Sequence, residues 1–151
     1  MADPSGARLS LIAARLGRGF TVACLGWSGP VERLAPVAQA LGDTGVLLVL
    51  GGAVDLFAAA ARSSALPPLA FIAAVPAALP LLSHALDAVI HSGTLEADTA
   101  AELRRALAPG GTLYLLSPRG MADEHALPLL RALGFTLREL GPGVAAATAP
   151  A

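Results

Sequence analysis

The sequence predicts a three-layer, doubly wound α/β domain with a seven-stranded, mostly parallel sheet and a C-terminal antiparallel hairpin. Three observations support this fold class. Five short, continuously apolar runs follow one another along the chain, as expected for parallel strands buried on both faces. Segments with helical periodicity separate these runs. The chain then ends in two strand-like runs around the turn sequence "GPG". A chain of 151 residues fits a single domain, residues 1–151.

Each strand is predicted from a short apolar run bounded by glycine, proline or polar residues. The run "FTVACL" is typical of a buried strand because its residues are apolar and β-prone. The runs "GVLLVL", "LAFIAAV", "LDAVIH" and "TLYLL" follow the same pattern. The predicted parallel strands are residues 20–25, 45–50, 69–75, 86–91 and 112–116, and the hairpin strands are residues 135–140 and 144–149.

The first two helices are predicted from apolar spacing and from end signals. Leu9, Ile12 and Leu16 share one face of a leading helix at residues 7–17, which precedes a core at residues 20–149. A second helix is predicted at residues 30–41. We expect Pro36 to kink this helix and Gly42 to cap it.

The later helices are predicted at residues 54–62, 99–107 and 124–133. Thr99 and Glu102 have the spacing of a capping box at the start of the second of these. The turn residues 109–111 are expected to end it. Pro128 is expected to disturb the last helix, and Gly134 to close it.

Composition excludes several classes of function. The net charge of −1 shows no nucleic-acid footprint. Cys24 is the only cysteine, so the chain alone forms neither an intrachain disulfide nor a cysteine-ligated metal or iron–sulfur site. The N-terminus lacks a signal-peptide pattern, which predicts a cytoplasmic protein. Residues 63–83 are uncharged, but their four prolines favour a strand and a loop over a membrane span.

Three stretches resemble the class I S-adenosylmethionine (SAM)-dependent methyltransferase fold. They are "ALPLLSHALDAVIHSGTL" at residues 78–95, "ELRRALAPGGTLYLLSP" at residues 102–118 and "LLRALGFTLREL" at residues 129–140. The "APGG" turn between helix and strand is the most specific piece. The resemblance implies a seven-stranded sheet whose last two strands form an antiparallel hairpin.

The resemblance also implies where SAM would bind. The family holds SAM with an acid and glycines around strand one, an acid that ends strand two, and an acid after strand three. Cys24, Gly51 and Val75 stand at these three acid positions. Asp55 lies four residues late, inside a predicted helix, where it suits the helix N-terminus. We therefore expect no bound cofactor, no catalytic residue and no metal site in this chain.

A second hypothesis retains SAM binding at an atypical pocket. The cofactor-binding residues under this hypothesis are Gly26, Ser28, Gly29, Asp55 and His91. His91 ends a predicted strand, where it serves either as a base near neutral pH or as a structural rim residue. The neighbouring Trp27 is expected either to fill the vacant cleft or to act as an exposed interface anchor.

Within the methyltransferase-like proteins, the sequence is most similar to the N-terminal domain of the anamorsin family. Ser28, Pro30, Val31 and Glu32 match the degenerate turn of that domain, and Gly29 departs from it. "LSHALDAVIHSGTL" resembles its later strand. The resemblance implies a non-catalytic interaction domain in cytosolic iron–sulfur cluster assembly, with a diflavin reductase as partner of the full protein. It also implies that residues 150–151 begin a linker to a cysteine-rich region.

The sequence thus leaves three functions open. The first is a non-catalytic interaction domain of the anamorsin type. The second is a SAM-dependent methyltransferase with an atypical cofactor pocket. The third is a degenerate methyltransferase-like domain of a multidomain synthase.

Overall fold

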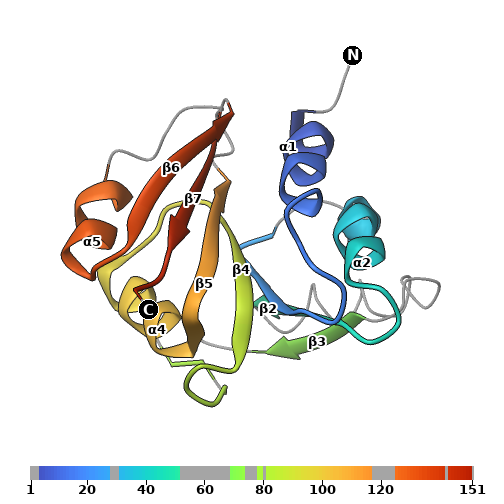
Figure 1. The fold of residues 1–151 in the computed structure, drawn as a ribbon, viewed down its shortest axis with the longest axis horizontal. Coiled ribbons are helices and arrows are strands. Elements are labelled where there is room, and N and C mark those ends of the chain that lie inside the picture. Colours follow the sequence, from blue (N-terminus) through green and yellow to red (C-terminus); the bar gives the residue numbers. More distant parts are fainter. Residues whose placement is uncertain are drawn as a thin grey trace.

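A computed structural model describes residues 4–27, 31–51, 69–73, 78–79, 81–116, 125–141 and 143–150 of the chain. Its strands form one seven-stranded sheet in the order β3-β2-β1-β4-β5-β7-β6 (Figure 1). The strands are β1 Thr21–Leu25, β2 Val46–Gly51, β3 Leu69–Ala73, β4 Leu86–Ser92, β5 Leu107–Leu116, β6 Thr136–Gly141 and β7 Val144–Thr148. The helices are α1 Pro4–Ala13, the 3₁₀ turn η1 Val31–Leu34, α2 Ala35–Leu41, α4 Ala97–Ala106 and α5 Ala126–Ala132.

The sheet topology confirms the predicted fold class. Strands β1 to β5 pair in parallel, and β7 inserts antiparallel between β5 and β6. The hairpin predicted around "GPG" is therefore part of the main sheet. The strand order reverses between β1 and β4, so the crevice where ligands bind in such sheets lies at the carboxyl ends of these two strands.

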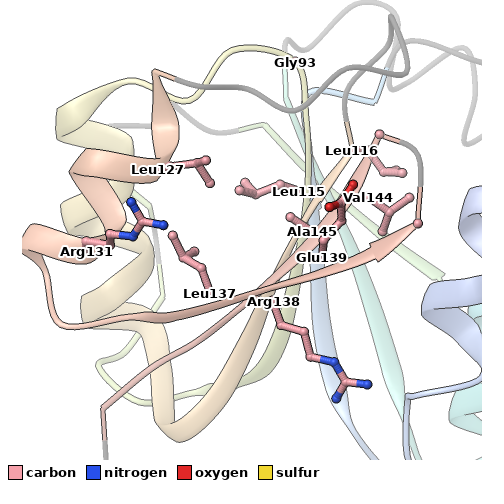
Figure 2. A pocket seen from close by; sticks show the side chains of 12 residues that line it. Gly93, Leu115, Leu116, Leu127, Arg131, Leu137, Arg138, Glu139, Val144 and Ala145 are labelled. Carbon is pink, nitrogen blue, oxygen red and sulfur yellow. The ribbon is translucent and has the colours of Figure 1, made fainter.

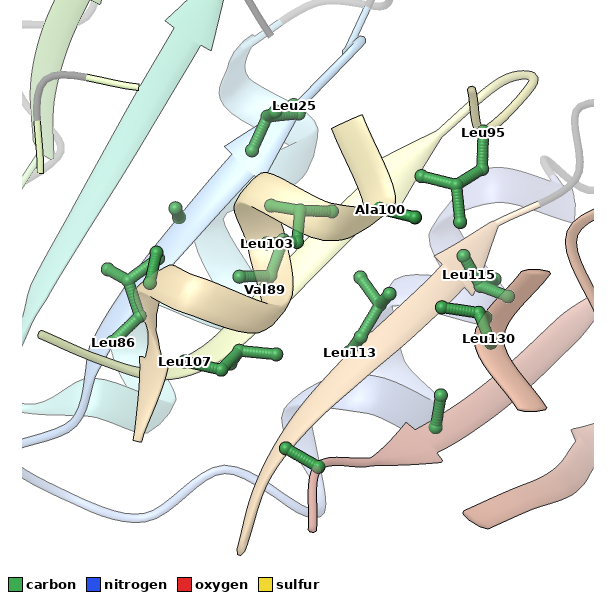
Figure 3. Packing of buried hydrophobic residues seen from close by; sticks show 14 of the residues in the cluster. Leu25, Leu86, Val89, Leu95, Ala100, Leu103, Leu107, Leu113, Leu115 and Leu130 are labelled. Carbon is green, nitrogen blue, oxygen red and sulfur yellow. The ribbon is translucent and has the colours of Figure 1, made fainter. Parts of the chain in front are cut away.

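Helices cover both faces of the sheet (Figure 1). Val22 and Cys24 of β1 pack in the apolar core beneath α1 and α2. Ala23 and Leu25 pack in the core beneath α4 and α5, where Leu103 and Leu130 come from the two helices (Figure 3). Alternating residues of one strand thus enter two different cores, which explains why the strand sequence is apolar without interruption.

The first two helices differ from the predicted ones at their ends. Helix α1 begins before residue 7 and ends at Ala13, because the Arg15 and Leu16 N–H groups donate to carbonyls three residues back and tighten the chain. The predicted helix 30–41 is divided into η1 and α2. Pro36 lies in the first turn of α2, where its missing N–H removes no helical hydrogen bond, so the expected kink was wrong. Gly42 caps α2 with φ +69°, as predicted.

The capping box at Thr99 was also wrong. Helix α4 begins at Ala97, and Thr99 is a buried residue of its first turn. The Glu102 carboxylate instead accepts the Leu79 N–H at 3.2 Å and hydrogen bonds from Arg105. The Arg105 hydrogen bond lowers the pKa of Glu102, so this acceptor is ionised at neutral pH. Glu102 therefore does not cap the helix. It links α4 by a hydrogen bond to Leu79, in the segment that precedes β4.

Strand β5 begins earlier than predicted. It pairs with β4 from Leu107, and the register shifts between the pairs at Leu86 and Ala88 of β4. Residues 109–111 therefore lie in an irregularity inside β5, and α4 ends at Ala106 instead. Pro128 causes no disturbance, because it lies in the first turn of α5.

Other predictions fall outside the described residues. These are the helix at 54–62, the end of the third strand at 74–75 and most of the uncharged segment 63–83. Among the described helices, none combines the length and the apolar character required to cross a membrane.

The insertion of β7 gives a prediction about the hairpin. A chain that ends at Gly134 lacks β6 and β7, so β5 loses its antiparallel partner and one wall of its core. We expect this chain to lose cooperative unfolding in a urea titration followed by circular dichroism. A chain that lacks just the last two residues, Pro150 and Ala151, is the control, and we expect it to retain the cooperative unfolding transition. Equal transitions in both chains would show that the hairpin is peripheral.

Candidate functional site

The carboxyl edge of β1 and β4 is the candidate site, because the strand order reverses there. At this edge β1 ends at Leu25 and the chain continues through Gly26 and Trp27. Strand β4 ends there at Ser92, and the chain continues through Gly93. The strands are in register up to the pair Leu25 and His91. The two chain segments that leave the sheet are therefore neighbours.

These two segments approach each other too closely for a side chain at Gly26. Gly26 has φ +73°, and a Cβ atom on it would lie 2.1 Å from the Ser92 carbonyl oxygen. Both the left-handed backbone and the contact require glycine. The first residue after β1 is therefore restricted to glycine by its own backbone and by the end of β4.

His91 is a buried residue of β4. Its exposed fraction is 6%, and its neighbours in register are Leu25 of β1 and Leu115 of β5. Strand alternation places it on the same face as Val89, beneath α4 and α5. Of the two alternatives, an exposed rim histidine does not fit, because β4 continues to Ser92 and the His91 side chain is buried.

Cys24, at the first acid position, is fully buried in the core beneath α1 and α2. Burial raises the pKa of its thiol to about 12, so the side chain is neutral at physiological pH. A neutral, buried thiol offers no charge to a ligand at the carboxyl edge.

Gly51 ends β2 at the second acid position, where it lies in register with Ala73 of β3. It has no side chain with which to bind ribose hydroxyl groups. Of the remaining predicted site residues, Ser28, Gly29, Asp55 and Val75 lie outside the described residues. The structure thus brings together Gly26 and the end of β4.

The surroundings of this edge bear on the prediction for Trp27. Trp27 is half-buried and packs on the core beneath α1 and α2, so it is not an exposed anchor. In the described part of the chain, no three His, Cys, Asp or Glu side chains are grouped as a metal site would require.

Solved structures that resemble this fold include SAM-dependent methyltransferases. One, from Aquifex aeolicus, has a TM-score of 0.74 and 18% identity over 97% of this chain and 93% of its own. The complex of the Trm112 methyltransferase activator with a proposed methyltransferase, from Haloferax volcanii, gives a TM-score of 0.75 and 16% identity over 97% and 90%. The chain has a methyltransferase-like fold. No family model matches it, and no curated protein matches it significantly.

The likeness of this methyltransferase-like domain to known structures concerns the fold alone, because the identities are low. The [4+2]-cyclase SpnF illustrates this point. It matches with a TM-score of 0.75 and 19% identity over 96% of this chain and 80% of its own, and its name describes a different reaction. The function must therefore be argued from the side chains at the site.

A cavity at the same edge was not predicted. Its volume is about 220 Å³, and it extends from Gly93 to helix α5 and strands β5, β7 and β6. The small residues "VAAAT" of β7 are the sequence signal for it, since alanine side chains leave space between larger neighbours. These alanines indicate a cavity only once β7 is known to lie between β5 and β6.

The Gly26 contact gives a stability prediction with a matched control. Gly26 and Gly110 both have left-handed backbones, but a Cβ atom on Gly110 meets nothing within 4 Å. We expect Gly110→Ala to lower the free energy of unfolding by about 1–2 kcal/mol. Gly26→Ala carries the same backbone cost plus the clash with Ser92, so we expect at least about 2 kcal/mol more. Urea unfolding measures both, and equal losses would contradict the close approach.

Burial of Cys24 predicts a pH dependence of stability. The thiol pKa rises from an ordinary value of 9.0 to about 12 on folding. Its contribution is complete below pH 9 and is lost as the pH rises toward 12, because the unfolded thiol ionises first. Between pH 8 and pH 10.5 we expect wild type to lose roughly 2 kcal/mol relative to Cys24→Ala. Parallel pH profiles in urea unfolding would show an accessible thiol.

Proposed function

We propose that this methyltransferase-like domain is a non-catalytic interaction module that does not bind SAM. The observation that supports the proposal is the pair Cys24 and Gly51. The first is a buried neutral thiol, and the second has no side chain. A hydrogen bond to a charged group contributes about 1.5–3 kcal/mol, so two lost acids weaken binding by roughly 3–6 kcal/mol, or on the order of 10²–10⁴-fold.

A finer assignment follows from the resemblance to the anamorsin N-terminal domain. It gives the domain a role in cytosolic iron–sulfur cluster assembly, where the full protein would bind a diflavin reductase. Its support is the sequence match at residues 28–32 and 83–95. The Haloferax volcanii complex offers a looser parallel, because a protein of this fold binds a partner protein there.

The second candidate is a SAM-dependent methyltransferase with an atypical pocket. The comparisons favour it, since the solved structures of this fold include many SAM-dependent methyltransferases. The glycine at position 26 also favours it, because the family that the sequence resembles places glycines after strand one. Gly26, Ser28, Gly29, Asp55 and His91 would then form the cofactor site.

Titration with SAM and with S-adenosylhomocysteine separates the two candidates. The proposal predicts no binding heat from either ligand at millimolar concentration in a calorimeter, because the charged acceptors are missing. An established SAM-dependent methyltransferase under identical conditions is the positive control. A dissociation constant in the micromolar range would overturn the proposal in favour of the methyltransferase.

A further inference from the structure

The cavity of about 220 Å³ lies between α5 and the antiparallel end of the sheet (Figure 2). It exists because β7 presents a small residue. Leu115 of β5, Ala145 of β7 and Glu139 of β6 are in register across three strands. Ala145 leaves the space above the middle strand of this row unfilled.

The walls of the cavity are apolar. Leu115 and Leu137 project from the sheet, and Leu127 projects from α5 toward them (Figure 2). Leu115 belongs to the buried core on this face, and Leu137 packs against it. An apolar group that fills the space above Ala145 would therefore contact carbon on three sides.

Three charged residues line the cavity, Arg131, Arg138 and Glu139. The Arg138 side chain points away from Leu137 and α5, so Arg131 and Glu139 are the two opposite charges on the α5 side (Figure 2). Arg131 follows Leu127 by one turn of α5, so both side chains share one face of the helix. Glu139 follows Leu137 by two residues on β6 and shares its face of the sheet. Figure 2 shows the Arg131 guanidinium beside α5 and the Glu139 carboxylate beside Val144 and Ala145.

These charges have no partners within the described part of the chain. Neither Arg131 nor Glu139 forms an ion pair or a side-chain hydrogen bond there. Both side chains are exposed, so they reach a ligand without first losing their hydration completely. The cavity thus offers a cation and an anion on either side of an apolar floor.

We propose that this cavity binds a small amphipathic zwitterion. Its apolar chain would lie above Ala145, its carboxylate would pair with Arg131 and its ammonium group with Glu139. The volume of about 220 Å³ corresponds to roughly seven water molecules, which suits a chain of about six carbons. Pockets that bury drug-sized ligands are larger, about 300–1,000 Å³. The proposal therefore goes beyond the proposed function and does not depend on SAM binding.

The probe is 6-aminohexanoate, compared with hexanoate and hexylamine, each of which lacks one charge. In calorimetric titrations up to about 10 mM, we expect 6-aminohexanoate to bind about tenfold or more tightly than either single-charge probe. Arg131→Gln and Glu139→Gln should each remove this advantage. Arg104→Gln and Glu96→Gln change exposed charges on and before α4 and should leave it intact.

A cavity-filling variant tests the location. Ala145→Leu should abolish binding of all three probes, whereas Ala132→Leu, at an exposed position of α5, should not. The thermal transition of each variant establishes that it is folded. If Ala145→Leu does not fold, the Glu139→Gln variant at an exposed position tests the location instead, through its loss of the advantage of 6-aminohexanoate over the two single-charge probes. The proposal is overturned by three results: no binding of 6-aminohexanoate, equal binding of the three probes, or unchanged binding in folded Ala145→Leu.

Discussion

The burial of both faces of β1 and β4 is the constraint on which the rest of the structure depends. Val22 and Cys24 enter one core, and Ala23 and Leu25 enter the other. The positions from Val22 to Leu25 of β1 and from Ala88 to His91 of β4 are all buried, and the one acid of β4, the half-buried Asp87 near its start, accepts the Thr21 N–H at 2.8 Å. The constraint explains the uninterrupted apolar strands and the neutral thiol of Cys24. It also explains why His91 is buried beneath α4 and α5 rather than exposed at a rim.

At the carboxyl edge, the close backbone approach at Gly26 is present, but acidic side chains are missing at positions 24 and 51. The turn at Gly26 keeps the left-handed backbone and the contact with Ser92. In the family that the sequence resembles, acidic side chains at the positions equivalent to 24 and 51 hold SAM. Here the positions are occupied by Cys24 and Gly51, which carry no charge. Such an edge provides a stable scaffold without strong polar recognition, which suits a domain that contacts other molecules through its surface.

Sequence predicted the strands well because double burial gives each of them a distinct apolar run. The helix ends were less predictable, since Pro36 and Pro128 are harmless in first turns. The role of Glu102 could not be predicted from local sequence, because its carboxylate accepts hydrogen bonds from the distant Leu79 N–H and from Arg105. Within the site, Cys24 and Gly51 were found by comparison with the family. The cavity was missed, since Leu115 and Ala145 become neighbours only through the long-range pairing of β5 with β7.

We propose that missing charge, rather than altered shape, prevents SAM binding at this edge. Equilibrium dialysis of labelled SAM against Gly51→Asp, with Gly51→Asn as neutral control, tests it most directly. The account predicts that the Asp variant binds about tenfold or more tightly than wild type, because a charged hydrogen bond is restored, and that the Asn variant stays close to wild type. Equal binding by the Asp and Asn variants, or wild-type binding as tight as that of the Asp variant, would contradict it.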